Sequence, residues 1–287
     1  MKVGSYTLSL VEAERFRLDG GAMFGVVPRP LWSREHAPDE KNRIQMVTRC
    51  LLARGDGRVV LVDTGMGDDW SEKERDIYAI ENGARSIVRA LAAKGVAPGD
   101  VTDVVLTHLH FDHTGGAVTR HEGGLSPTFP NARYHVQEAQ LAWAQSPTER
   151  DRRSYRGDTF LPLLKQGRFV PARGKSEILP GVHVEPTQGH TVGHQVVRFG
   201  DGPGSVLYCG DLIPTAAHLP TPWVMGYDLF PVTTMNEKRD LLERAADQQW
   251  VLVMEHDPLN PAVLAGREKD GFVPAARVGM DDAPFVL

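Results

Sequence analysis

The chain has 287 residues with 41% hydrophobic and 24% charged side chains, which is ordinary for a globular protein and long enough for one large domain. No apolar run approaches the ~20 residues that a membrane-spanning helix needs, so we expect no membrane partner. The net charge of −5 argues against a protein that binds phosphate backbones, so we also expect no nucleic-acid partner.

The predicted elements are of both kinds and are mixed along the chain. The pattern predicts strands at 45–52, 59–62, 101–107, 132–136, 182–186, 195–199, 206–209 and 250–254, and helices at 80–93 and 237–246. Segment 144–174 is rich in charge with scattered Pro and Gly, and its pattern fits either a helix with a surface loop or a lid. The sequence therefore predicts a mixed α/β fold.

Two of these predictions have a specific local cause. Asp56-Gly57 supplies the positive φ angles of a tight turn, so the first two strands should form a hairpin. Apolar residues from Ile80 to Leu91 recur at intervals of three and four, and Gly95 stands where a helix would end.

The number of cysteines and the first residues of the chain indicate the cellular compartment. The two cysteines, Cys50 and Cys209, are too few for a disulfide framework, and we expect both to be reduced and buried. The apolar stretch near Met1 is too short and interrupted for a secretion signal. A cytoplasmic location is therefore expected.

The main chemical signal follows the strand at 101–107. Residues His108, His110, Asp112 and His113 place three imidazoles and one carboxylate within six positions. These are ligands that zinc and neighbouring first-row metals accept, and a tight turn can direct them toward two different ions. Further ligands must come from elsewhere, and the candidates are His190, Asp211 and His256, each in a segment punctuated by glycine or polar residues.

In this order the motifs resemble those of the metallo-β-lactamase superfamily. They are Asp63-Thr64-Gly65 at a strand end, His-x-His-x-Asp-His at 108–113, Gly-His-Thr-x-Gly-His at 189–194, Gly210-Asp211, and a late His256. The resemblance spans roughly residues 45 to 260. It implies a four-layer αβ/βα sandwich in a single domain over 1–287, with residues 1–42 adding an N-terminal strand and a loop that lines the pocket.

The same resemblance implies a metal centre with a defined ligand set. His108, His110 and His190 would hold one metal, Asp112, His113 and His256 the other, and Asp211 would bridge them. Two divalent ions, most often zinc but with manganese, iron or cobalt also accepted, would lower the pKa of a shared water toward neutrality. The resulting hydroxide could attack an ester, lactone or phosphoryl centre, with Asp112 or Asp211 moving a proton. The sequence has neither a Gly-x-Ser-x-Gly motif, which would indicate a serine nucleophile, nor a phosphate-binding Gly-rich loop.

Within the superfamily, residues 20–28 and the Gly-His-Thr-x-Gly-His-Gln form look most like quorum-quenching lactonases and the related methyl parathion hydrolase type. We therefore expect a lactonase of the acyl homoserine lactone type, with a phosphotriester or aryl ester hydrolase as the alternative and a non-catalytic metal-binding scaffold as a remote one. Several lactonases carry a Tyr three residues after the bridging Asp, where this chain has Pro214. His218 or Tyr227 is expected to take over that catalytic contact. A homodimer is an expectation from family analogy.

Other residues receive more ordinary interpretations. Asp63 is expected to orient a ligand histidine, and His194 to be structural or an outer partner of the site. His135 and His183 fall in strands, and His36 and His121 in loops, so that His36→Ala should change little. Apolar and aromatic residues that could line a pocket are Met23, Phe24, Trp32, Trp223, Tyr227 and Phe230.

Overall fold

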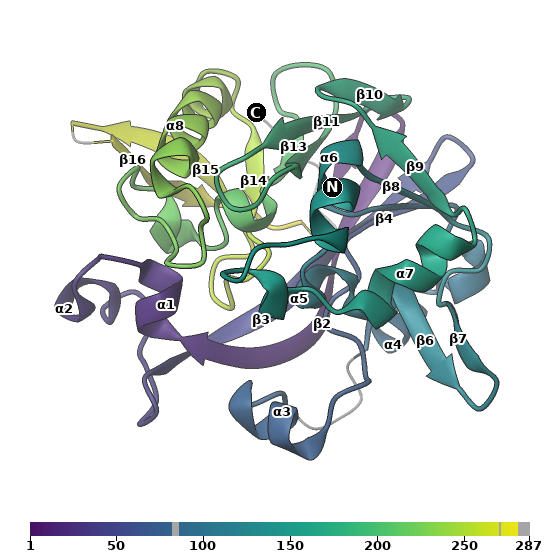
Figure 1. Ribbon diagram of the computed structural model, residues 1–287. Coiled ribbons are helices and arrows are strands. Elements are labelled where there is room, and N and C mark those ends of the chain that lie inside the picture. Colours follow the sequence, from purple (N-terminus) through teal and green to yellow (C-terminus); the bar gives the residue numbers. More distant parts are fainter. Residues whose placement is uncertain (82–85, 270, 281–287) are drawn as a thin grey trace.

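Two β-sheets lie face to face at the centre of the protein (Figure 1). The structure is a computed structural model, and it describes residues 1–81, 86–269 and 271–280. Each sheet has seven strands, and a separate two-stranded hairpin, β6 (Val118–His121) and β7 (Gly124–Pro127), stands apart from them.

The first sheet is built mainly from the N-terminal half of the chain. Its strands, in spatial order, are β1 (Lys2–Val3), β2 (Tyr6–Asp19), β3 (Arg43–Gly55), β4 (Arg58–Val62), β5 (Asp103–Val105), β8 (Arg133–Gln137) and β9 (Phe169–Ala172). Strands β4, β5, β8 and β9 run parallel. The β3–β4 hairpin closes through Asp56 and Gly57, whose φ values are 52° and 67°, so the predicted tight turn is confirmed.

The second sheet is contiguous in the C-terminal half. Its strands are β10 (Ser176–Leu179), β11 (Val182–Thr187), β12 (His194–Phe199), β13 (Val206–Tyr208), β14 (Val251–Val253), β15 (Ala262–Glu268) and β16 (Gly271–Arg277). Only the β13–β14 pair is parallel among these neighbours. Its crossover contains α8 (Pro231–Asp247), which is consistent with the longer connection that a parallel pair requires.

Three apolar layers hold the sandwich together. Between the sheets, side chains such as Leu51 and Val105 pack against Val197 and Tyr208. On the outer face of the first sheet lie α4 (Ile87–Ala92), α6 (Glu138–Gln145) and α7 (Gly157–Lys165), and on the outer face of the second lies α8. The predicted αβ/βα sandwich is thus confirmed.

The predicted helix at 80–93 is only partly correct. Helix α4 covers Ile87–Ala92, residues 82–85 lie outside the described residues, and Ile80 is not helical. Ile80 instead belongs to an apolar cluster with Trp70 and Tyr78. It follows a short helix, α3 (Glu72–Ile77), which begins with a capping box between Ser71 and Glu74. The apolar residue that resembled the start of an amphipathic stripe therefore belongs to a different cluster.

Two short helices, α1 (Gly20–Phe24) and α2 (Arg29–Trp32), follow β2. Phe24 and Trp32 stack with ring centroids 5.6 Å apart. His36, which follows this pair, is 6% exposed and lies 5.7 Å from the Phe24 ring. His36 is therefore a buried side chain, and the expectation that His36→Ala changes little does not fit this packing. Among the described residues, no helix is both long and apolar enough to cross a membrane.

Candidate metal centre and pocket

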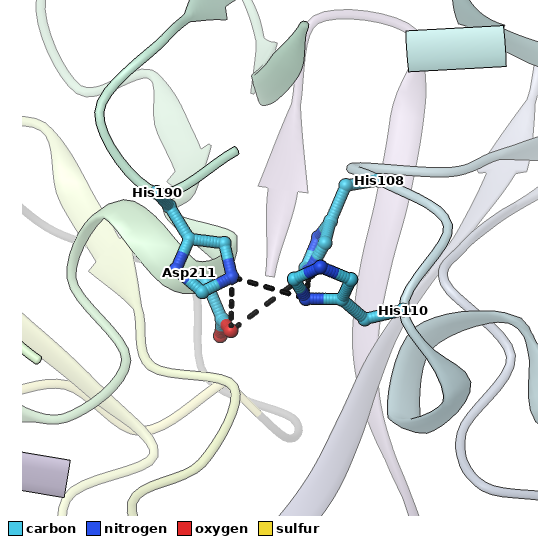
Figure 2. Close-up of side chains that lie close together, drawn as sticks. All are labelled: His108, His110, His190 and Asp211. Carbon is cyan, nitrogen blue, oxygen red and sulfur yellow. Dashed lines mark hydrogen bonds and ion pairs between the residues drawn. The ribbon is translucent and has the colours of Figure 1, made fainter. Parts of the chain in front are cut away.

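The predicted ligand residues converge at one edge of the sandwich because they follow the ends of strands from both sheets. The turn after β5 carries His108 and His110 and leads into a short helix, α5 (Phe111–Thr114). His190 follows β11, Asp211 follows β13, and His256 follows β14. Figure 2 shows imidazoles from the two halves converging on the Asp211 carboxylate.

One group of ligand atoms comprises His108, His110, His190 and Asp211, whose candidate donor atoms all lie within 4.8 Å of one another. Nδ1 of His110 lies 2.9 Å from Nε2 of His108 and 3.2 Å from Nε2 of His190. Asp211 Oδ2 lies 3.1 Å from Nε2 of His190 and 3.8 Å from Nε2 of His108. Four nitrogen and oxygen donors therefore lie close enough together to share one ion, and four is the number of ligands in a tetrahedral metal site.

The second group lies on the other side of the same carboxylate. Asp211 Oδ1 is 3.0 Å from Nε2 of His256 and 3.6 Å from Nε2 of His113. The predicted ligand Asp112 lies 3.7 Å from each of these nitrogens, but the fourth member of this group, whose candidate donor atoms lie within 4.8 Å of one another, is Glu255. Glu255 is close as well, but its Oε1 contacts Nδ1 of His113 at 3.1 Å, the nitrogen opposite the one that faces Asp211. Asp112 thus approaches from the pocket side, and Glu255 lies behind His113.

The backbone of Asp211 is held by His194. Nε2 of His194 accepts a hydrogen bond from the Asp211 N–H at 3.1 Å, and its Nδ1 lies 2.7 Å from the hydroxyl of Thr187. A Cβ on Gly210, which has a φ of +49°, would come within 2.7 Å of the same Nε2. Glycine at 210 therefore lets the imidazole approach the turn closely, and His194 acts as an outer partner of the site.

The imidazoles of candidate ligands also contact partners through their other ring nitrogen. Asp63 Oδ2 accepts from Nδ1 of His113 at 2.9 Å and from the Thr107 hydroxyl at 2.7 Å, as expected of a residue that orients the candidate ligand His113. Nδ1 of His190 is 2.9 Å from Oδ1 of Asp228, a residue that the sequence reasoning missed. No local motif marks Asp228, because it lies 38 positions from its partner.

The charges in the site are strongly coupled. Burial lowers the pKa of His108 and His110 well below the usual value, which leaves neutral imidazoles suited to bind a metal. Burial opposes ionisation of Asp211, but His190 and neighbouring imidazoles hold its pKa well below the usual range. For His190 and His256 burial is outweighed by carboxylates, chiefly Asp211, which raise the pKa of each to about 9.

Several fully buried polar atoms point into this site without a hydrogen-bond partner among the described residues. They include Nε2 of His113 and Oδ1 of Asp211. Leaving such atoms unpaired costs on the order of 1–3 kcal/mol each. Imidazole nitrogens and carboxylate oxygens are suitable donors for divalent first-row ions, so the residues present fit a metal centre.

A pocket opens directly over the two groups. His110, Asp112, His190, Asp211 and His256 form its floor. Its apolar and aromatic wall consists of Leu18, Met23, Tyr78, Phe111, Met225 and Tyr227, and its rim includes Arg150, Arg153 and Ser154. Residues of the N-terminal segment therefore do line the pocket.

The predicted substrate residues have different positions. Tyr227 lines the pocket and is 38% exposed. His218 is 1% exposed, with Nδ1 2.7 Å from the Thr215 hydroxyl and Nε2 2.8 Å from the Met23 carbonyl. Both ring nitrogens are thus occupied by protein atoms, its ring stacks on Phe24 at 4.6 Å, and it is not among the pocket-lining residues. This geometry does not support a substrate contact by His218.

Of the predicted aromatic and apolar wall, Met23 and Tyr227 line the pocket. Phe24 and Trp32 lie in the core beneath it, with Trp223 packed against them, and Phe230 is 46% exposed at the start of α8. The Gly- and Pro-rich segments that carry these residues have no hydrophobic periodicity. The sequence could therefore not distinguish side chains that line the pocket from side chains of the core.

The remaining histidines have ordinary partners. His135 Nε2 lies 2.8 Å from Asp103, and His183 Nε2 lies 2.6 Å from Asp201. His121 is exposed on the β6–β7 hairpin. None of the three belongs to the groups of metal-binding side chains found among the described residues, in agreement with their ordinary interpretation.

Comparisons with known proteins agree with this geometry. A model of the metallo-β-lactamase superfamily matches residues 44–256. A probable metallo-hydrolase of Mycobacterium tuberculosis is 30% identical over 244 residues, covering 75% of this chain and 76% of that protein. An N-acyl homoserine lactonase of Bacillus thuringiensis is 27% identical over 220 residues, covering 72% of this chain and 80% of that one.

A solved structure extends the similarity to the whole fold. The structure of a probable metal-dependent hydrolase from Staphylococcus aureus superposes with a TM-score of 0.86 at 28% identity, covering 97% of this chain and 100% of that chain. Because the family model spans most of the sandwich and ends at the last candidate ligand, this chain belongs to the metallo-β-lactamase superfamily and is a metal-dependent hydrolase.

Proposed function

We propose that the protein binds two divalent metal ions and hydrolyses a lactone or a related ester. The observation that carries the proposal is the position of Asp211. Its Oδ2 faces His190 at 3.1 Å while its Oδ1 faces His256 at 3.0 Å. A carboxylate with one oxygen toward each group of donors is suited to bridge two ions.

In this proposal His108, His110 and His190 hold one ion, and Asp112, His113 and His256 hold the other. The candidate donors are nitrogen and oxygen atoms, and neither group of donors among the described residues includes a cysteine. Such a set favours zinc and also admits manganese, iron or cobalt. Bound ions would lower the pKa of water toward neutrality and polarise a substrate oxygen.

The side chains of the pocket would then perform three tasks. Asp112, at the floor, is placed to accept a proton from the attacking water, and Asp211 is a second acceptor. Tyr227 lines the pocket, and its phenol, which is protonated at neutral pH, can donate a hydrogen bond to a substrate carbonyl. The aromatic wall would exclude water and bind apolar parts of the substrate.

Lactones are the preferred substrate class because the chain is similar to an N-acyl homoserine lactonase over 220 residues. Position 214 is proline, and its carbonyl accepts a hydrogen bond from the His256 N–H at 3.0 Å. Tyr227 is therefore the proposed replacement for a catalytic tyrosine at position 214. An acyl homoserine lactone preference would make quorum quenching the biological role.

A phosphotriester or aryl ester is the second candidate. Tyr78 and Phe111 lie together on the pocket wall, with ring centroids 5.2 Å apart. Such a surface would accept an aromatic leaving group by stacking or edge contact.

The test compares hydrolysis of a long-chain acyl homoserine lactone, a simple γ-lactone and a nitrophenyl phosphotriester by protein whose metal content has been measured. Faster cleavage of the lactones supports the first candidate, and Tyr227→Phe should then lower kcat. Faster cleavage of the phosphotriester supports the second. Failure to cleave these three compounds and the acidic ester mono-4-nitrophenyl glutarate by protein with two bound metals would contradict the proposed function.

A further inference from the structure

The rim of the pocket between 146 and 156 is a fixed part of the site. Asp151 is 5% exposed and accepts hydrogen bonds from Trp143 Nε1 at 2.7 Å and from the Thr148 hydroxyl at 2.6 Å. Four residues on, the Tyr155 hydroxyl lies 2.8 Å from the hydroxyl of Thr191, the neighbour of the candidate ligand His190. The rim is thus anchored on both sides of Arg153.

Two arginines lie on this rim and line the pocket. Arg150 donates to the carbonyls of Gly226 at 2.5 Å and Asp228 at 3.3 Å, which flank the pocket-lining residue Tyr227. Arg153 is exposed, and no hydrogen bond or ion pair of its side chain is found within the described part of the chain. Neither guanidinium has a carboxylate within ion-pair distance among the described residues.

The other charged pocket residues do not neutralise these cations. The carboxylates that line the pocket are Asp112 and Asp211, and both face the imidazoles at its floor. The rim is therefore cationic in a protein whose net charge is −5. A neutral acyl chain would gain little from such a rim, whereas a carboxylate or phosphate would gain charge-assisted hydrogen bonds.

We propose that the substrate carries an anionic group at the end remote from the bond that is cleaved, and that Arg153 binds this group. The inference rests on the proposed hydrolysis at the metal centre, and it narrows the substrate of that reaction to an acidic lactone or ester. Arg150 is a positioning residue that contributes positive potential while it joins the rim to the segment carrying Met225 and Tyr227.

The kinetic test uses two nitrophenyl esters with acyl chains of similar length, 4-nitrophenyl butyrate and mono-4-nitrophenyl glutarate, on metal-loaded protein. We expect a higher kcat/KM for the glutarate ester. Arg153→Gln should raise KM for that ester by roughly fivefold, which corresponds to the upper end of the free energies measured for exposed ion pairs. The KM for the butyrate ester should stay unchanged. Raising the ionic strength should reduce the preference because exposed charges are screened.

Arg152→Gln is the matched control, because Arg152 is an adjacent exposed arginine that does not line the pocket. It should leave both esters unchanged. Equal kcat/KM for the two esters with wild-type protein would overturn the inference, as would an equal effect of Arg152→Gln and Arg153→Gln.

A binding measurement separates this inference from the proposed function. Calorimetry of the metal-loaded protein compares glutarate with butyrate, which differ by the second carboxylate. Tighter binding of glutarate, lost in Arg153→Gln, supports the anion site even if neither ester is cleaved, and equal binding overturns it. Including 4-phosphonobutyrate, which has the same three-methylene spacer as glutarate, distinguishes the two kinds of anion, since tighter binding than glutarate would indicate a phosphate group and weaker binding a carboxylate.

Discussion

Asp228 lies behind His190, with its Oδ1 2.9 Å from the ring Nδ1, and its Oδ2 accepts the Met225 N–H at 3.1 Å. One carboxylate therefore joins a candidate metal ligand to the segment that lines the pocket. Asp228→Ala is expected to weaken metal affinity or activity roughly 10- to 100-fold, as for other carboxylates that orient ligand histidines. Asp228→Asn, which keeps an acceptor, should cost less.

The measurement is metal content by mass spectrometry together with kcat/KM on the best substrate. Asp240→Ala, an exposed aspartate on α8, is the control and should behave as wild type. Unchanged metal affinity and activity in Asp228→Ala would show that His190 needs no such partner.

Asp211 lies between the two groups of candidate donors, with one oxygen toward each. We expect Asp211→Asn and His108→Ala to lower activity by roughly 100-fold or more, because each removes a metal donor, while far-UV circular dichroism stays unchanged. His121→Ala, on an exposed hairpin, replaces His36→Ala as the histidine control because His36 is buried. Full activity in Asp211→Asn protein with two bound metals would refute the bridged arrangement.

Glu14 should make stability depend on pH. It is 3% exposed, and burial raises the pKa of its carboxyl to about 8, although the Thr48 hydroxyl and the Met66 N–H donate to it. The folded state then holds a proton that the unfolded state releases between about pH 4.5 and 8. Because the folded state binds more protons in this window, the free energy of unfolding falls as pH rises through it.

Glu14→Gln removes this titration, so the variant should gain stability relative to wild type as pH rises from 5 to 8, on the order of 1–3 kcal/mol. Urea unfolding at several pH values measures the difference. The exposed Glu149→Gln is the control, and its curve should run parallel to that of wild type. A parallel curve for Glu14→Gln would mean that Glu14 is ionised in the folded protein.

Arg49 joins the two halves of the sandwich. It is 3% exposed, and its Nη1 donates to the carbonyls of Met254 at 2.6 Å and Asp257 at 2.8 Å, on either side of His256. Arg49→Met leaves these carbonyls unpaired and should lower the free energy of unfolding by about 2–4 kcal/mol.

Chemical denaturation tests this, with Arg54→Met on the exposed part of β3 as the comparison. Metal affinity should fall as well, because the segment that holds His256 loses its anchor. A loss no larger than that of Arg54→Met would contradict the assigned role.

The sequence was most informative where local chemistry decides the structure. Asp56-Gly57 predicted its turn because positive φ favours those residues, and the cluster from His108 to His113 predicted a site at a strand end. The helix prediction was wrong at Ile80 because this residue and its neighbours fit a helical period. Ile80 is buried in a cluster with Trp70, and hydrophobic periodicity does not encode such a contact.

Contacts between distant segments explain what the sequence left out. The role of Asp228 depends on a loop that returns to His190, and the rim arginines lie in a segment without a regular pattern. His218 was expected to contact the substrate because it follows Asp211 closely in the sequence. In the structure, the contact of its Nε2 with the Met23 carbonyl joins it to the N-terminal segment instead. Sequence spacing alone cannot supply these pairings.

The division of the candidate site between the two sheets has a consequence for how the protein is made. Strands of the first sheet lie within 2–172 and those of the second within 176–277, and each sheet supplies part of the candidate ligand set. During synthesis the segment with His108, His110 and His113 leaves the ribosome well before His256. A nascent chain therefore lacks a complete set of metal donors until its second half has docked, and the onset of hydrolysis would report completed folding.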